Sequence, residues 1–128
     1  MTRLICILSF CVCASPVWAW TDYYECTIEE MLRAGGPVTN RLLNSVKANK
    51  VIVERDTGVI KHPIWFVSPE YIDGSLVLDR GNDMRYFKAY TYTSLRVFVA
   101  ITVDESASSQ KKPMSLLVNQ DVYTGYCY

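Results

Sequence analysis

The sequence predicts a mainly β fold, a small antiparallel barrel or sandwich with a short N-terminal helical segment. From Lys50 onward, short runs of β-branched and aromatic residues alternate with turn residues, a pattern typical of antiparallel strands. Two cysteines near the ends of the chain, Cys26 and Cys127, would fasten the first and last strands of such a sheet together. No repeat at a fixed period and no linker interrupts the chain, so we expect a single domain over residues 20–128.

Residues 1–19 predict a secretory signal peptide. Arg3 precedes an apolar run from Leu4 to Ala14, and Val17-Trp18-Ala19 places small or apolar residues where signal peptidase reads the chain. The apolar run is shorter than the roughly 20 residues that a membrane-spanning helix needs. We therefore expect cleavage after Ala19, no membrane span afterwards, and a protein that is periplasmic or secreted.

Cysteine usage predicts one disulfide. Cys6, Cys11 and Cys13 leave with the signal peptide, so the mature chain keeps only Cys26 and Cys127. In an oxidising compartment these two have a single intramolecular pairing. A redox role would call for CxxC spacing and a helix N-terminus that lowers a thiol pKa, and the sequence shows neither.

The first part of the domain predicts one strand and then helical structure. Residues 22–26 are expected to be a short strand. Residues 27–30 have the spacing of a capping box, residues 31–34 favour a helix, and Gly35-Gly36-Pro37 would end it. Residues 41–46 also have helical apolar spacing, which neighbouring asparagines and a serine weaken.

The remainder predicts strands joined by turns. Residues 51–54 and 59–61 flank Arg55-Asp56-Thr57-Gly58, where Gly58 can supply the positive φ of a hairpin. About seven or eight strands are expected in all. The later strands are predicted at residues 75–78, 85–91, 95–103, 114–118 and 121–127, with a turn at Asp79–Asp83 and a polar loop at Glu105–Pro113.

Several segments together carry a resemblance to known proteins. They are Tyr24-Glu25-Cys26, Glu54-Arg55-Asp56-Thr57-Gly58, Val77-Leu78-Asp79-Arg80-Gly81, Phe87-Lys88, Lys112-Pro113 and Tyr123-Thr124-Gly125-Tyr126-Cys127. In this ordered set the chain resembles a group of small exported bacterial proteins with no assigned function, although residues 36–49 and 62–73 depart from that group. The resemblance implies a bacterial exported protein and no particular reaction.

A second likeness is to the periplasmic inhibitors of lysozyme. Those proteins are small disulfide-bonded barrels, and this chain looks like them in size, leader and expected β architecture. Their inhibitory loop motif, a serine and a tyrosine around glycines, has no counterpart here. The likeness therefore implies a fold, and a fold does not fix a function.

Composition and motifs exclude several classes of function. The chain has 13 Lys plus Arg against 13 Asp plus Glu, so it lacks the basic field of a nucleic-acid binder. His62 is the only histidine, which leaves a zinc site at most one imidazole ligand, and a surface or hydrogen-bonded histidine is the ordinary explanation. Gly35-Gly36 is not a phosphate loop, and Asp79–Asp83 lacks the order of a calcium-binding EF-hand loop. We expect no metal and no cofactor.

A hydrolase using carboxylates is the one enzymatic alternative. A glycosidase needs two carboxyl groups roughly 5 to 10 Å apart in a cleft. Glu54, Asp56, Asp73 and Asp79 offer such groups, but sequence does not supply the distance. A short chain without long loops seldom builds a cleft. We therefore predict no catalytic residues and no enzyme.

The candidate binding site is the hairpin at residues 85–103. Leu95, Val97, Val99, Ile101 and Val103 alternate with polar and aromatic residues and are expected to face inward. If the connecting turn has an odd number of residues, Phe87 shares this core face, and an even number reverses the arrangement. The odd turn gathers outward an aromatic and cationic patch of Lys88, Tyr90, Tyr92, Arg96 and Phe98.

This patch suits recognition of a protein or a sugar, because Tyr and Arg are common interface anchors and aromatic faces attract cations. The alternative is that the rings only cover a sheet face beneath the N-terminal helical segment. The leading hypothesis is thus an exported non-enzymatic module that binds an envelope or secreted protein, such as an inhibitor or immunity protein of an envelope-acting hydrolase. A structural envelope protein is the second hypothesis, and a small carboxylate-dependent hydrolase is the third.

Overall fold

The computed structural model describes residues 22–62, 71–82 and 85–128. The predicted signal peptide lies outside this part of the chain. Nine elements follow one another: β1 Tyr23–Arg33, α1 Asn40–Lys47, β2 Val51–Glu54, β3 Ile60–Lys61, β4 Ile72–Asn82, β5 Arg85–Thr93, β6 Phe98–Asp104, β7 Lys112–Val118 and β8 Asp121–Cys127.

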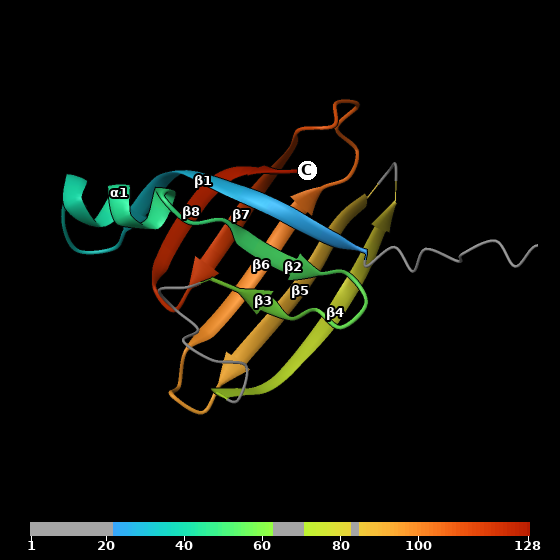
Figure 1. Ribbon diagram of the computed structural model, residues 1–128, viewed down its shortest axis with the longest axis horizontal. Helices are drawn as coiled ribbons and strands as arrows, with labels where there is room; N and C mark the ends of the chain where they lie inside the picture. The colour runs from blue at the N-terminus through green and yellow to red at the C-terminus, as the bar shows by residue number, and fades with distance from the viewer. Residues whose placement is uncertain (1–21, 63–70, 83–84) are drawn as a thin grey trace, which may run out of the picture.

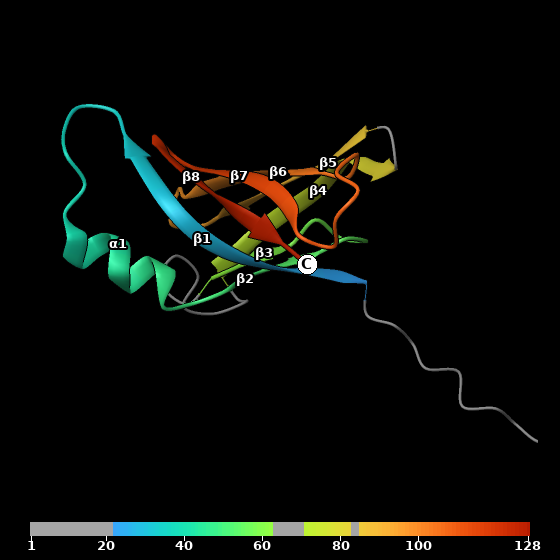
Figure 2. The same ribbon diagram turned by 90° about the horizontal axis from the view of Figure 1, so that it is seen from above.

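The strands form one antiparallel sheet in the order β3-β2-β1-β8-β7-β6-β5-β4. Figures 1 and 2 show that β1, β2 and β3 cross in front of β5, β6 and β7, so the sheet curls over its own inner face into a nearly closed barrel. The prediction of a mainly β antiparallel fold is confirmed.

The predicted helical segment at residues 27–34 is wrong, because residues 27–33 belong to β1 and Ala34 lies in the turn that follows. Tyr24, Cys26 and Ile28 alternate inward, and a β-bulge between Ile28 and Glu30 then turns Met31 to the core. Pairing with β8 along this length satisfies the backbone groups that a helix would have bonded internally. The local capping-box signal is thus overridden by long-range strand pairing.

The only α-helix in the described part of the chain is α1, which covers the weaker helical pattern predicted at residues 41–46. Thr39 caps it, since its side-chain oxygen accepts a hydrogen bond from the Leu42 backbone N–H at 3.4 Å. Val46 is fully buried, and Leu42 and Leu43 pack against the core. The helix therefore lies beside β1 and covers one end of the barrel (Figure 2).

The core consists of inward side chains from nearly all strands. Val99, Ile101 and Val103 of β6 are buried as predicted, but the prediction for Leu95 is wrong because it lies exposed in the turn before β6. The largest fully buried apolar side chains are Ile28, Ile60, Phe87, Ile101, Leu116 and Tyr123. These residues fill the barrel interior with packed side chains.

The structure contains the predicted Cys26–Cys127 disulfide. The two cysteines are directly opposite each other in the β1–β8 register, and both are fully buried. The bridge closes a sequence separation of 101 residues. It fastens β1 to β8 and brings the C-terminus back beside β1 (Figure 1).

The β2–β3 hairpin contacts β4 and β5 through side chains instead of a backbone ladder. Thr91 of β5 donates its hydroxyl hydrogen to the Gly58 carbonyl at 2.9 Å and accepts a hydrogen bond from the Ile60 N–H at 3.0 Å. Ser75 of β4 donates to the Thr57 carbonyl at 2.8 Å. The β2–β3 hairpin is thereby held against β4 and β5, which brings the barrel close to closure.

β4 is longer than predicted. The turn predicted at Asp79–Asp83 is wrong for residues 79–82, which continue the strand, while Asp83 lies outside the described residues. A bulge between Val77 and Asp79 keeps the strand paired with β5 past the glycine at position 81. Gly81 has the left-handed φ of a turn residue, 70°, but it lies within β4 and makes the strand locally irregular instead of ending it.

Candidate binding face

The β5–β6 turn determines which side chains of this hairpin face outward. The Thr93 N–H donates to the Val97 carbonyl at 3.0 Å, and the Arg96 N–H donates to the Thr93 carbonyl at 3.0 Å. Between Thr93 and Val97 lie three residues, of which Arg96 has a left-handed φ of 61°. This is the odd turn, and it puts Phe87 in the core and the even-numbered residues of β5 outside.

Three aromatic side chains form a contiguous cluster on the outer face: Tyr90, Tyr92 and Phe98, hereafter the aromatic cluster. Tyr92 and Phe98 are directly opposite each other in the register. The ring centroid of Tyr90 lies 6.4 Å from that of Tyr92 and 5.6 Å from that of Phe98. Tyr92 is 45% exposed and Phe98 is 41% exposed, while Tyr90 between them is half-buried.

Gly74 makes room for Tyr92 on the neighbouring strand. The two residues are paired between β4 and β5, and a Cβ atom at position 74 would lie 2.5 Å from the Tyr92 hydroxyl oxygen. That separation is shorter than any non-bonded contact, so a side chain here would displace the ring. The bare glycine backbone therefore lets Tyr92 lie across β4.

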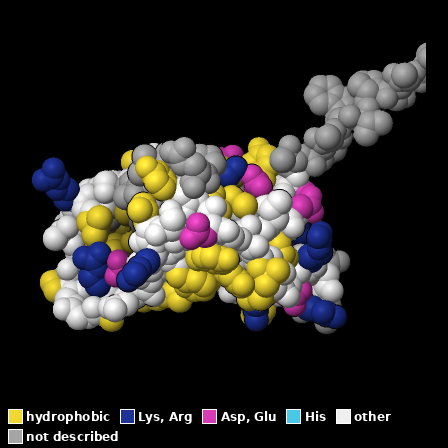
Figure 3. Space-filling view, turned by 90° about the horizontal axis from the view of Figure 1, so that it is seen from below, with side chains coloured by type: hydrophobic (Ala, Val, Ile, Leu, Met, Phe, Trp, Pro, Cys, Tyr) yellow, Lys and Arg dark blue, Asp and Glu magenta, His cyan; other side chains and the backbone are white. Residues whose placement is uncertain are grey.

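An apolar row continues from the aromatic cluster around the outside of the barrel. Register pairs join one outward residue from each of six strands, namely Leu76, Tyr90, Ala100, Leu117, Val122 and Leu32. Each of these side chains is exposed or half-buried. Figure 3 shows a contiguous group of hydrophobic side chains near the lower edge of the face seen from below, with Lys and Arg beside it and further hydrophobic side chains elsewhere on that face.

Sequence reasoning identified the part of this face on β5 and β6 but missed the remainder. The signal for Leu76 and Leu78 was present as apolar residues on alternate positions of β4, but the predicted strand was too short for its two faces to be distinguished. Leu32 was missed because its segment was interpreted as a helix. The contributions of Leu117 and Val122 depend on register across several strands, which one sequence does not reveal.

The two predicted cations lie at opposite ends of the aromatic cluster. Lys88 precedes Tyr90 by two residues on β5, and Arg96 lies in the turn beyond Tyr92. Both are exposed, and neither forms an ion pair within the described part of the chain. Lys88, Tyr90, Tyr92 and Phe98 thus lie on the outer face of the hairpin, and Arg96 lies exposed in its turn. α1 does not cover them, since it lies on the β1 side of the sheet (Figure 2).

The four carboxylates considered for a hydrolase are placed differently. Glu54 binds Lys61 Nζ at 2.5 Å and accepts from the Thr57 hydroxyl at 2.8 Å, and these hydrogen bonds lower the pKa of Glu54. Asp56 pairs with Arg80 at 3.1 Å, and Asp79 accepts from the Gly81 N–H at 3.0 Å. Asp73 lies exposed in a β4 bulge. Three of the four are therefore engaged in local structure.

Metal chemistry has no support in the residues described, because no group of three His, Cys, Asp or Glu lies there in an arrangement that could hold an ion. His62 is buried, and its Nε2 lies 3.4 Å from the Val46 carbonyl oxygen. Burial lowers the pKa of His62, against the opposing effect of hydrogen bonds to the Val46 and Asn49 carbonyls. The histidine joins β3 to the end of α1.

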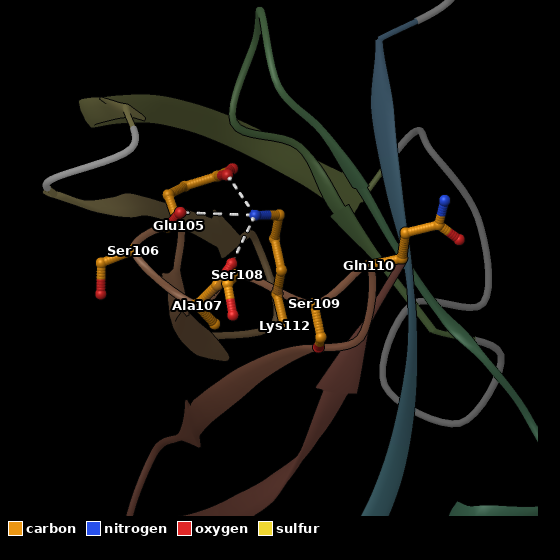
Figure 4. A pocket seen from close by; sticks show the side chains of 7 residues that line it. All are labelled: Glu105, Ser106, Ala107, Ser108, Ser109, Gln110 and Lys112. Carbon is orange, nitrogen blue, oxygen red and sulfur yellow. Dashed lines mark hydrogen bonds and ion pairs between the residues drawn. The ribbon is translucent and has the colours of Figure 1, made fainter.

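A cavity of about 470 Å³ lies beneath the β6–β7 loop and is lined by residues 105–110 and Lys112 (Figure 4). Lys112 Nζ pairs with the Glu105 carboxylate at 3.2 Å and lies 3.4 Å and 3.5 Å from the Glu105 and Ala107 carbonyl oxygens. Arg55 pairs with the other oxygen of the same carboxylate at 3.4 Å. The contacts of Lys112 Nζ are all made within the loop and stabilise its conformation. We therefore assign this cavity a structural role in the loop and no role in binding.

Comparison of the chain with protein-family models, with curated proteins and with solved structures found no match. No helix in the described part of the chain has both the length and the apolar character needed to cross a membrane.

Proposed function

We propose that this protein is an exported, non-enzymatic binding module that docks onto an envelope or secreted protein through the outer face of β4, β5 and β6. The observation that carries the proposal is the exposure of the aromatic cluster. Tyr, Trp and Arg dominate the energetics of protein interfaces, and Tyr is an effective anchor because it buries a large area at low entropic cost. The aromatic cluster contains two tyrosines and a phenylalanine, and Arg96 lies in the adjoining turn.

The surroundings of the cluster support a protein as the ligand. The apolar row extends across six strands, and it would give a partner a continuous surface wider than the aromatic cluster itself. Exposed apolar patches of a few hundred Å² or more commonly mark interaction sites. The engagement of Glu54, Asp56 and Asp79 in local structure favours this proposal over the carboxylate-dependent hydrolase.

The predicted leader and the disulfide support export. A buried Cys26–Cys127 bridge is typical of proteins that fold in the periplasm or outside the cell. An inhibitor or immunity protein of an envelope-acting hydrolase is the most specific form of the proposal, and the resemblance to small exported bacterial proteins fits it. Because those proteins have no assigned function, the resemblance does not indicate a particular partner.

The test is affinity capture from envelope extract and culture medium with the immobilised mature domain. Quantitative mass spectrometry compares the wild-type protein with Tyr92→Ala and Phe98→Ala. The matched control is Tyr23→Ala, which removes an equally exposed tyrosine, at 47%, from β1. We expect the face variants to lose at least one partner by about 5-fold to 150-fold, corresponding to about 1 to 3 kcal/mol. The control should retain it.

Equal capture by all four proteins would contradict the proposal. Retention of every envelope component by the face variants, with co-sedimentation of the protein with the envelope itself, would instead support a structural envelope protein.

A further inference from the structure

We propose that the partner presents carboxylates to Lys88 and Arg96, on either side of an apolar segment that covers the aromatic cluster. This inference rests on the proposed function and names the chemistry of the partner. It follows from the position and the free charge of these two cations.

The cations bracket the rings along the strand direction. Along the outside of β5 the order is Lys88, Tyr90 and Tyr92, and Arg96 follows in the turn, level with position 94 in the register. At about 3.3 Å per residue, positions 88 and 94 lie about 20 Å apart. A partner that covers the rings therefore meets a positive charge at each end of the contact.

Several cations of the barrel are paired with acidic neighbours, whereas Arg85 at the start of β5 has no ion pair among the described residues. Arg33 binds Asp121 through two nitrogens at 3.0 Å each, Lys61 binds Glu54, and Arg80 binds Asp56. Lys88 differs from these although a carboxylate lies near it. Asp79 is its register partner on β4, but the Asp79 carboxylate turns back to the Gly81 N–H at 3.0 Å.

The two cations of this face keep no ion-pair partner. Two carboxylates lie on the neighbouring strand, Asp73 and Asp79 of β4, but neither forms an ion pair with Lys88 or Arg96 in the described structure. Asp104, at the far end of β6, is held by the Ser106 backbone and hydroxyl. The edges of the aromatic rings are also the positive part of their quadrupoles, so they add to the attraction for carboxylate groups.

The charges disfavour two other occupants. In a two-fold symmetric dimer the same patch meets itself, so a second copy would bring these cations toward each other. An anionic membrane attracts a nearby Lys or Arg by only about 1 kcal/mol each, and stable electrostatic binding takes a larger basic cluster than two residues. A protein surface with acidic residues around an apolar centre fits both the charge and the rings.

Two synthetic peptides test the inference. The first has the sequence Glu-Ser-Trp-Ser-Trp-Ser-Glu, which in an extended conformation places its glutamates about 20 Å apart. The second replaces both glutamates with lysine and keeps the apolar residues. Each is titrated into isotope-labelled mature domain at low salt, and binding is measured from the backbone amide shifts.

We expect the glutamate peptide to shift the amides of the aromatic cluster and of Lys88 and Arg96, and to bind at least five-fold more tightly than the lysine peptide. Added salt should reduce the difference. The double variant Lys88→Gln, Arg96→Gln should abolish it. The control double variant Arg41→Gln, Lys47→Gln, which removes two exposed cations of α1, should preserve it.

Equal binding of the two peptides, binding of neither, or shifts located on α1 would overturn the acidic partner. Binding to phosphatidylglycerol vesicles that needs Lys88 and Arg96, without a preference between the peptides, would overturn it in favour of a membrane. These failures differ from failure of the proposed function. If Tyr92→Ala still abolishes capture while the peptides show no preference, the face docks onto a partner that is not acidic.

Discussion

Thr91 of β5 is hydrogen-bonded to Gly58 in the β2–β3 turn, where the two ends of the curled sheet approach each other. The Thr91 hydroxyl lies on the inner side of β5 and donates to the Gly58 carbonyl in the β2–β3 turn at 2.9 Å, and its oxygen accepts the Ile60 N–H at 3.0 Å. All three residues are buried. One side chain thus satisfies a backbone acceptor and a backbone donor at the place where the barrel lacks a backbone ladder.

We predict that Thr91→Val lowers the free energy of unfolding by about 2 to 5 kcal/mol. Valine keeps the shape but leaves two buried backbone groups unpaired, and each such group costs about 1 to 3 kcal/mol. The control is Thr91→Ser, which keeps the hydroxyl and loses only one methyl group. Urea denaturation of the three proteins measures the difference, and equal stability of the valine and serine variants would contradict the role given to the hydroxyl.

Gly58 must also remain without a side chain. Its φ is +76°, and a Cβ atom would lie 2.7 Å from the Leu76 carbonyl carbon of β4. Gly35 has a comparable φ of +97° but open space around it. We therefore predict that Gly58→Ala destabilises the protein clearly more than Gly35→Ala, which reports only the backbone cost of about 1 to 2 kcal/mol. Thermal and urea unfolding of both variants compare the two effects.

The sequence predicted those parts of the fold that local alternation determines. Val99, Ile101 and Val103 faced the core as expected, and Gly58 was identified as a hairpin glycine. The strand β1 was missed because the Thr27 to Glu30 spacing favours a helix locally, whereas pairing with β8 decides its conformation. Similarly, the hydrogen bond between Thr91 and Gly58 joins residues 33 positions apart, and no local sequence pattern indicates it.

The candidate face could be predicted only as far as a single hairpin. The choice between an odd and an even turn decided whether Tyr90 and Tyr92 lie inside or outside, and the observed odd turn contains Arg96 in a left-handed conformation. Arginine is uncommon in the left-handed conformation, so the residue type at position 96 did not indicate the turn geometry. The apolar row beyond the hairpin depends on the register of four further strands.

Removal of the disulfide by the double variant Cys26→Ala, Cys127→Ala should lower the free energy of unfolding by about 2 to 5 kcal/mol. The bridge spans 101 residues of sequence, so it restricts the unfolded chain strongly. Denaturation of both proteins under oxidising conditions provides the measurement. Wild-type protein treated with a reductant should approach the variant in stability, and free thiols in protein isolated from the envelope would contradict the bridge.

The single histidine makes one pH effect attributable to a single residue. Burial lowers the pKa of His62 below its ordinary value of 6.5, so the folded state favours the neutral imidazole. The unfolded state binds a proton near pH 6.5, before the folded state does. Stability is therefore highest above that pH and falls as the pH decreases from 6.5 toward the folded pKa.

The prediction is checked by urea denaturation at a series of pH values for wild type and His62→Gln. The wild type should lose stability between pH 6.5 and the folded pKa of His62, and the variant should show a flatter profile there. The loss due to Glu54, whose pKa is also lowered, occurs at more acidic pH, below its ordinary value of 4.5. An imidazole NMR titration with a pKa at or above 6.5 would refute the prediction.

Substitution of two phenylalanines in the same hairpin distinguishes its core face from its outer face. Phe87 is fully buried on β5, and Phe98 is 41% exposed on β6. We predict that Phe87→Ala costs about 3 to 5 kcal/mol of unfolding free energy, as loss of a buried ring does. Phe98→Ala should cost about 1 kcal/mol or less, because surface substitutions remove little packing. Chemical denaturation of both variants under identical conditions measures the contrast.

The outcome bears directly on the proposed function. If Phe98→Ala and Tyr92→Ala each leave the fold near its original stability, the two rings contribute little to folding and remain accessible for the proposed binding. Tyr90→Ala should lie between the two phenylalanine variants, since Tyr90 is half-buried between its neighbours. A loss of about 3 kcal/mol or more on removal of Phe98 would make this ring part of the core. The partner would then have to bind elsewhere on the barrel.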